Sequence, residues 1–148
     1  MVARSSEAST QSNAEPAVET AAANRLADGV YLYGQSPEAD QLGMEYFVAE
    51  VRDGQTVGAF YMPRSSFDCF YGRFEAKQLA LTVINSYDRT EHPFKLALRD
   101  NYFVATNHNP ALDGGQPRGY HRLAELSEND QRMLQTCKAD LQERVWGQ

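Results

Sequence analysis

The aromatic residues of this chain are concentrated in one segment, and this distribution limits the folds that the chain can adopt. Fourteen of the sixteen lie between Gly29 and Thr106, interleaved with branched aliphatic and polar residues in runs of five to nine. Aromatic and β-branched residues that alternate with polar ones are typical of β-strands. The segment therefore predicts a sheet so rich in rings that both of its faces need cover.

The same segment predicts seven strands joined by short connections. Short connections favour antiparallel neighbours, because parallel strands need a long crossover. We therefore expect a β-meander, in which each strand pairs with the next one along the chain. The expected strands are Gly29–Gly34, Met44–Arg52, Gln55–Met62, Ser66–Phe74, Gln78–Asn85, Phe94–Arg99 and Tyr102–Thr106.

A two-residue turn sets the register of the second and third strands. Asp53-Gly54 lies between two alternating runs, and a type I′ turn needs a positive φ angle at both of its central positions. This turn places Phe47 opposite Phe60 on one face and Tyr46 opposite Tyr61 on the other. Each aromatic pair stabilises a sheet by roughly 0.2–1 kcal/mol relative to an alanine pair.

The register has one further consequence, and a second turn extends the pattern. Ala49 faces Gly58, two small residues that leave a gap in which something bulky can cross the sheet. Asp100-Asn101 is another two-residue turn, which would pair Leu98 with Phe103.

The C-terminal segment has the periodicity of a helix. Ser127 followed by Asp130 resembles a capping box with Asp in place of Glu, and apolar residues then recur at spacings of three, four and four, from Leu134 to Val145. We expect one amphipathic helix over Glu128–Arg144. The predicted fold class is α+β: a curved antiparallel sheet or small open barrel of about seven strands, with this helix packed on it.

Residues 1–28 have a different composition. They contain no aromatic residue, and such a segment cannot bury enough apolar area to offset the entropy of ordering it. We expect a disordered tail or linker before a single domain over residues 29–148. Arg4 is the only early cation and no apolar signal core follows it, so either the protein is cytoplasmic or the chain starts after a removed export signal or anchor. A tail that resembles a tether favours the second interpretation.

Charge and motif spacing exclude several classes of function. A net charge of -6 argues against a nucleic-acid partner, because phosphate contacts need a local surplus of Lys and Arg. The longest apolar run is far short of the ~20 residues of a membrane-spanning helix. The three histidines, His92, His108 and His121, have no recognised metal-ligand spacing. We therefore expect no metal and no cofactor.

The two cysteines lie on faces that the fold would bring together. Cys69 shares a strand face with Phe67 and Tyr71, and Cys137 lies on the apolar stripe of the predicted helix. They are either two buried free thiols that pack as small hydrophobic groups, or a disulfide that links the helix to the sheet. A bridge would close a loop of 68 residues (137 minus 69), which stabilises by on the order of 4 kcal/mol, and it would imply an oxidising compartment.

No catalytic motif accompanies the remaining candidate residues. Covalent catalysis by Cys69 with His108 or His121 would need an exposed thiol, and Ser65-Ser66 lacks the context of a nucleophile elbow. The loop from Asn107 to Gly119 is rich in Gly, Pro and Asn and could be functional. One face of the sheet should pack as a core, and the other could offer rings to a small ligand or a partner. The candidate surface residues are Tyr46, Tyr61, Tyr71, His108, Arg118 and His121.

Four runs of this sequence resemble a group of uncharacterised small cyanobacterial proteins. These runs are Tyr31–Pro37, Glu45–Gly72, the GYHR of Gly119–Arg122 and Leu126–Leu141. In that group an N-terminal signal, lipoprotein or membrane-anchor segment precedes a polar linker and then this domain. The resemblance implies no known activity. Because both cysteines fall inside resembling runs, it favours the disulfide over free thiols.

These observations together predict a non-enzymatic, extracytoplasmic accessory or binding domain of a photosynthetic bacterium. It would lie in the periplasm or thylakoid lumen, tethered through its N-terminus, and bind an unknown protein partner or a small apolar ligand through its sheet. One alternative is a small hydrolase or isomerase that uses the Asn107–His121 loop with an acid from a strand. Another is a lipocalin-like carrier, which would need an apolar cavity of roughly 300 Å³ or more.

Overall fold

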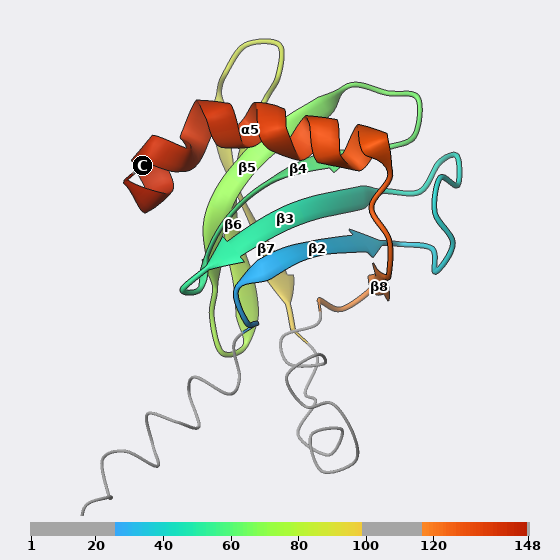
Figure 1. Ribbon diagram of the computed structural model, residues 1–148, viewed down its shortest axis with the longest axis horizontal. Coiled ribbons are helices and arrows are strands. Elements are labelled where there is room, and N and C mark those ends of the chain that lie inside the picture. The colour runs from blue at the N-terminus through green and yellow to red at the C-terminus, as the bar shows by residue number, and fades with distance from the viewer. Residues whose placement is uncertain (1–25, 99–116, 148) are drawn as a thin grey trace, which may run out of the picture.

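A computed structural model describes residues 26–98 and 117–147 of the chain. They form one seven-stranded antiparallel sheet and one helix, which confirms the predicted α+β class (Figure 1). The order of strands across the sheet is β7-β6-β5-β4-β3-β2-β8, so the chain runs as a meander and its last strand pairs beside the first. The elements are β2 (Gly29–Gly34), β3 (Tyr46–Arg52), β4 (Gln55–Tyr61), β5 (Phe67–Phe74), β6 (Gln78–Ile84), β7 (Glu91–Ala97), β8 (His121–Leu123) and α5 (Glu128–Trp146).

The hairpin between β3 and β4 has the predicted turn and register. Both turn residues have a positive φ, 53° at Asp53 and 81° at Gly54. Phe47 pairs with Phe60, and one position earlier on β3 the ring of Tyr46 stacks on Tyr61, its partner on β4, with centroids 5.6 Å apart. The turn chemistry therefore determines which rings face each side of the sheet.

A phenylalanine fills the predicted gap between β3 and β4. Gly58 pairs with Ala49 on one side and with Phe70 of β5 on the other. A Cβ atom added to Gly58 would lie 2.5 Å from Cζ of Phe70 and 2.1 Å from the carbonyl oxygen of Val48. The ring of Phe70 is therefore the bulky group that lies over Gly58, and only glycine at position 58 leaves room for this ring.

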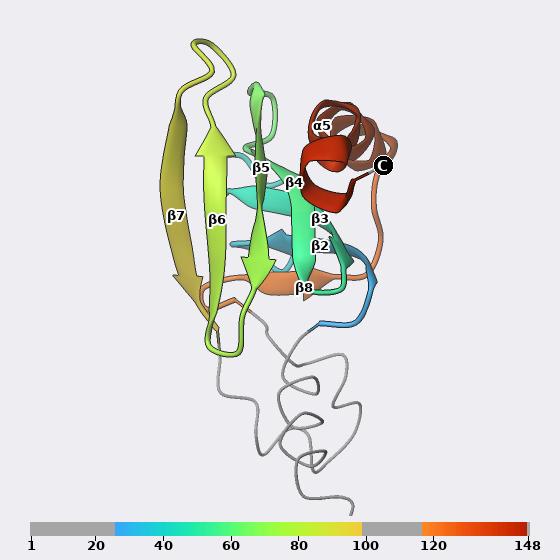
Figure 2. The same ribbon diagram turned by 90° about the vertical axis from the view of Figure 1, so that its left-hand side faces the viewer.

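The sheet is strongly curved, and each of its two faces carries its own hydrophobic core. Figure 2 shows β6 and β7 upright while β2, β3 and β8 run across the view. The inner face gathers the rings of Tyr33, Phe47 and Phe70 with aliphatic residues from β6 and from Leu98 beyond β7. The outer face is covered by α5, whose buried stripe includes Met133 and Leu141. Both faces are covered, as so aromatic a sheet requires.

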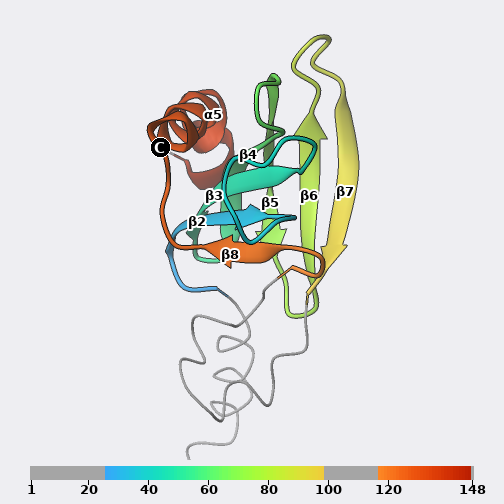
Figure 3. The same ribbon diagram turned by 90° about the vertical axis from the view of Figure 1, so that its right-hand side faces the viewer.

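The two edges of the sheet come together at one end. Leu98, just beyond β7, forms a β-bridge with Pro117, which precedes β8, and the amide of Arg118 donates to the carbonyl of Ala97 at 2.8 Å. Figure 3 shows the adjacent ends of β7 and β8 side by side. The two edges of the curved sheet are thus bonded to each other at this end, whereas a cleft remains between β7 and the start of β3.

The helix begins and ends with the capping interactions that its sequence favours. The Oγ of Ser127 accepts a hydrogen bond from the amide of Asp130, and the Asp130 carboxylate accepts one from the amide of Ser127. Gly147 adopts a left-handed φ of 77° and ends the helix. The helix therefore begins at Glu128, as predicted, and runs two residues past Arg144 to Trp146.

Several expected boundaries differ from the observed ones. Strand β7 begins at Glu91 rather than Phe94, since an edge position allows Pro93 to lie inside a strand. Strand β8 was not predicted, because three residues are too few to show an alternating pattern. The expected strand Tyr102–Thr106 and the turn at Asp100-Asn101 lie outside the described residues. The expected tail also lies outside the described residues, apart from its last residues, from Leu26, which pack onto the domain.

Candidate functional site

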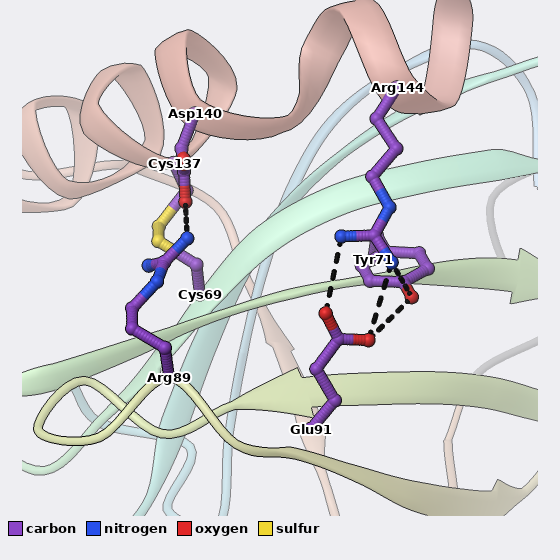
Figure 4. A network of polar contacts seen from close by, with 7 residues as sticks. All are labelled: Cys69, Tyr71, Arg89, Glu91, Cys137, Asp140 and Arg144. Atoms are coloured by element: carbon purple, nitrogen blue, oxygen red, sulfur yellow. Dashed lines mark hydrogen bonds and ion pairs between the residues drawn. A yellow bond between two sulfur atoms is a disulfide. The ribbon is translucent and has the colours of Figure 1, made fainter.

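The two cysteines form a disulfide between the sheet and the helix. Cys69 of β5 and Cys137 of α5 are joined by an S–S bond of 2.06 Å, with their Cα atoms 5.4 Å apart (Figure 4). Cys137 is fully buried. Of the two alternatives that the sequence left open, the structure shows the bridge.

Two polar contacts near the disulfide tie the β6–β7 region to the helix. Beside the disulfide, Arg89 pairs with Asp140 at 2.9 Å (Figure 4). Farther along the helix, Arg144 pairs with Glu91 at 3.2 Å and donates to the hydroxyl of Tyr71 at 2.6 Å, while that hydroxyl donates to Glu91 at 2.9 Å. Hydrogen bonds from Arg144 and Tyr71 lower the pKa of Glu91. Tyr71 is thus part of a contact between strand and helix.

The other two predicted tyrosines also lie on the helix side of the sheet. Tyr46 is fully buried, and its hydroxyl donates to the carbonyl of Glu38 at 2.6 Å and accepts from the amide of Gln41 at 2.9 Å. Tyr61 is half-buried and donates its hydroxyl to the buried carboxylate of Asp130. Burial, followed by this hydrogen bond, raises the pKa of Tyr61. These two rings hold the loop after β2 and the start of α5 in place.

The predicted loop residues are only partly described. Arg118 is exposed and precedes β8, and His121 is the exposed first residue of β8, opposite Gly34. His108 lies outside the described residues, so the convergence of His108, His121 and a carboxylate that an enzyme would need stays a prediction. Among the described residues, no group of three or more His, Cys, Asp or Glu side chains could hold a metal ion.

The inner face of the sheet holds a cleft that the sequence analysis did not identify. It has a volume of about 240 Å³ and opens between the start of β3 and the edge strand β7. Side chains from five strands or strand ends contribute to it. Residues that pair across neighbouring strands lie on the same face of the sheet, so these side chains can line one cleft. The lining residues are Glu45, Phe60, Asp68, Val83, His92, Pro93 and Phe94.

Two phenylalanines form the apolar part of this cleft. Phe60 belongs to the aromatic core, where it packs against Phe47 and Phe70 with centroids 5.0 and 4.9 Å apart. Phe94 meets Phe60 edge-to-face at 5.3 Å, yet 36% of its surface remains exposed. The aromatic core thus continues without interruption to an exposed ring at the edge of the sheet.

Three ionisable side chains lie around these rings. Glu45 accepts a hydrogen bond from the hydroxyl of Tyr120 at 2.8 Å, and Asp68 accepts one from the amide of Ser86 at 2.9 Å. The Nε2 of His92 lies 2.9 Å from the hydroxyl of Thr90. Burial, together with the nearby Glu45 carboxylate, raises the pKa of Tyr120, so this hydroxyl stays protonated and donates.

The cleft residues share a pattern that is visible in the sequence once the structure is known. At three strands an ionisable residue stands two positions before a phenylalanine: Glu45, which directly precedes β3, before Phe47, Asp68 of β5 before Phe70, and His92 of β7 before Phe94. Residues two apart on a strand share a face, so all three ionisable groups lie on the inner face with the rings. Curvature of the sheet, which alternation does not encode, then brings the three strands around one cleft.

Two other hollows have a different character. One of about 440 Å³ lies at the start of α5, between side chains of both charges such as Arg64 and Glu125, and its buried Asp130 is already bonded to Tyr61 and Ser127. Another of about 400 Å³ borders the contact between Tyr71 and Arg144. Among the described residues that line them, neither combines an exposed aromatic ring with carboxylates that lack a partner cation, so we take the cleft on the inner face as the candidate site.

Comparison with known proteins adds no relative to this description. No protein-family model matches the chain, and neither a curated protein nor a solved structure matches it. Within residues 26–98 and 117–147, no helix has both the length and the apolar character needed to cross a membrane. The geometry of the cleft and the disulfide are therefore the basis on which a function can be proposed.

Proposed function

We propose that this protein is a non-enzymatic extracytoplasmic accessory domain that binds a small, partly apolar ligand in the cleft on its inner face. The observation that carries the proposal is the exposed ring of Phe94, which continues the aromatic core and lies in one cleft with Glu45 and Asp68. Ligand sites in proteins are concave and mostly apolar, with a few polar groups that fix orientation. The cleft has this composition on a small scale.

The size and openness of the cleft distinguish this proposal from a lipocalin-like carrier. A carrier would enclose its ligand in a cavity of roughly 300 Å³ or more. The cleft measures about 240 Å³ and is bounded on one side by the edge strand, where His92, Pro93 and Phe94 are all exposed. These features favour a ligand of the size of one ring, held against the open side of the sheet.

The disulfide supports the extracytoplasmic part of the proposal. Disulfides persist in oxidising compartments and are rare in the cytosol, and this one joins Cys69 to the buried Cys137. The resemblance to small cyanobacterial proteins with an N-terminal export or anchor segment points in the same direction. A periplasmic or thylakoid-lumen location in a photosynthetic bacterium is the setting that we propose.

A fragment screen by NMR tests the ligand site. We expect small aromatic and aliphatic fragments to shift the amide signals of Glu45, Asp68 and Phe94 in the ¹⁵N-labelled full chain. Val83→Trp, which fills the cleft from β6, should abolish these shifts. Thr82→Trp is the matched control, because residue 82 points to the opposite face of the same strand. Fragments that leave the cleft signals unchanged in the wild type, while shifting others, would overturn the proposal.

Thiol trapping in cells of the source organism tests the compartment. Cells are quenched in acid, fractionated and alkylated before and after reduction. We expect the protein in a membrane or lumenal fraction with no alkylated cysteine until reductant is added. Recovery in the cytosol with both thiols alkylated at once would contradict the extracytoplasmic setting.

A further inference from the structure

We infer that the cleft selects an organic cation with a small apolar body, such as a ring that carries an ammonium group. The inference rests on the proposed function and names the class of ligand that the same site would take. It follows from three properties of the cleft: the balance of its charges, the rings beside them, and its volume.

The acidic side chains of the cleft have different partners from the acidic side chains on the helix side of the sheet. On that side Glu50, Asp140 and Glu91 each form an ion pair with a Lys or Arg at 2.8 to 3.2 Å. Within the described part of the chain, Glu45 and Asp68 form no ion pair and accept hydrogen bonds from a hydroxyl and an amide, which are neutral donors.

Among the described residues, no Lys or Arg lines this cleft, and the other ionisable residue of its lining is His92. The two carboxylates therefore give the cleft a negative charge that no described cationic side chain in its lining balances. A cation is attracted to such a site and an anion is repelled from it. Charge complementarity thus selects the positive ligand.

The aromatic rings favour the same sign of charge. The face of a phenylalanine ring carries a negative quadrupole and attracts ammonium groups within about 6 Å of its centroid. Phe94 is the exposed ring of the cleft, and Phe60 meets it edge-to-face with centroids 5.3 Å apart. Together they offer apolar area to the body of a ligand and a favourable field to its cationic group.

The volume limits the size of the ligand. Drug-sized molecules occupy pockets of roughly 300–1,000 Å³. A cleft of about 240 Å³ suits a single ring or short alkyl chain with one charged group. Benzylamine, which is protonated at neutral pH, has this size and charge and is the probe that we would use.

The test compares three probes of similar shape. Benzylamine, benzyl alcohol and phenylacetate are titrated into the ¹⁵N-labelled full chain at low salt, and the signals of Glu45, Asp68 and Phe94 are followed. We expect benzylamine to bind about tenfold more tightly than benzyl alcohol, as one or two partly desolvated charge contacts allow, and phenylacetate not to bind. Raising the salt concentration should weaken benzylamine binding and leave benzyl alcohol unaffected.

Matched variants assign this selectivity to the acids. Glu45→Gln and Asp68→Asn should each weaken benzylamine binding about threefold to tenfold and leave benzyl alcohol binding unchanged. Glu143→Gln, which removes an exposed acid from the helix, should change neither. The amide signals outside the cleft report whether each variant is folded.

The outcomes separate this inference from the proposed function. Equal binding of benzylamine and benzyl alcohol at the cleft would overturn the cation class and leave a ligand site in place, and so would tighter binding of phenylacetate. Failure of benzylamine to shift any cleft signal also overturns the inference. The proposed function is overturned as well only if the wider fragment screen also leaves the signals of the cleft unchanged.

Discussion

Cys69, near the start of β5, is joined to Cys137, in the middle of α5, with their Cα atoms 5.4 Å apart. The helix covers the outer face of the sheet, where it packs on Val48, Val57 and Ala59. The bridge therefore fastens this cover to the sheet and leaves the inner face, with its cleft, on the other side.

Removing the bridge should destabilise the domain substantially. The double substitution of Cys69 and Cys137 by Ser should lower the free energy of unfolding by on the order of 4 kcal/mol, because a loop of 68 residues is no longer closed in the unfolded chain. Urea denaturation measures the change. Reductant should lower the stability of the wild type by a similar amount and have no effect on the double variant. Equal stability of the wild type with and without reductant would show that the bridge is absent or contributes nothing.

Tyr61→Phe should destabilise the contact between the sheet and the start of α5. The hydroxyl of Tyr61 donates to the carboxylate of Asp130, whose side chain is buried at the capping box. Loss of a hydrogen bond to a buried charged group costs roughly 1.5–3 kcal/mol. Tyr87→Phe is the matched control, because Tyr87 is 85% exposed. Thermal or urea unfolding should separate the two variants, and an equal, small effect of both would contradict the role assigned to Tyr61.

Glu50 should make the stability of the domain dependent on acid pH. Burial by itself raises the pKa of Glu50, but hydrogen bonds from Lys138 and Arg52 outweigh it, and the pKa lies below its ordinary value of 4.5. A carboxyl with a lowered folded-state pKa stabilises the fold above its unfolded pKa, and this stabilisation is lost as the pH falls through the folded pKa. The loss should therefore occur below about pH 4.5.

Unfolding of Glu50→Gln between pH 2 and 7 tests this dependence. At pH 7 the variant should be less stable than the wild type by on the order of 1 kcal/mol, the upper range for an accessible ion pair. The difference should shrink as the pH falls below about 4.5. Glu143→Gln, on the exposed side of the helix, serves as the control. A difference between Glu50→Gln and wild type that stays constant across this range would contradict the lowered pKa.

Local sequence patterns were sufficient to predict most of the fold. Asp53-Gly54 permitted the tight turn, and alternation around it placed Phe47 against Phe60 in the observed register. Ser127 and Asp130 marked the start of the helix. These features depend on residues that are close in sequence, so propensity and periodicity can reveal them.

The cleft could not be predicted in the same way. Glu45 directly precedes β3, whereas Asp68 and His92 lie on β5 and β7, and no motif joins residues so far apart. The pairing order places them on one face, but only the curvature of the sheet brings β7 near the start of β3. The tyrosines chosen from the sequence lay on the opposite face, where the helix covers Tyr46 and contacts Tyr61. Alternation showed which residues share a face, and only the possible disulfide between Cys69 and Cys137 indicated which face the helix would cover.

Intermolecular NOEs from a bound ligand test most directly whether the cleft is the binding site. Benzylamine is added to the full chain with ¹³C-labelled side chains, and NOEs between its ring protons and the protein are recorded. We expect contacts to the rings of Phe60 and Phe94 and to the methyl groups of Val83, which line the cleft together. NOEs to the exposed Leu42 or to Tyr71 beside the helix, with none to Phe94, would contradict the site.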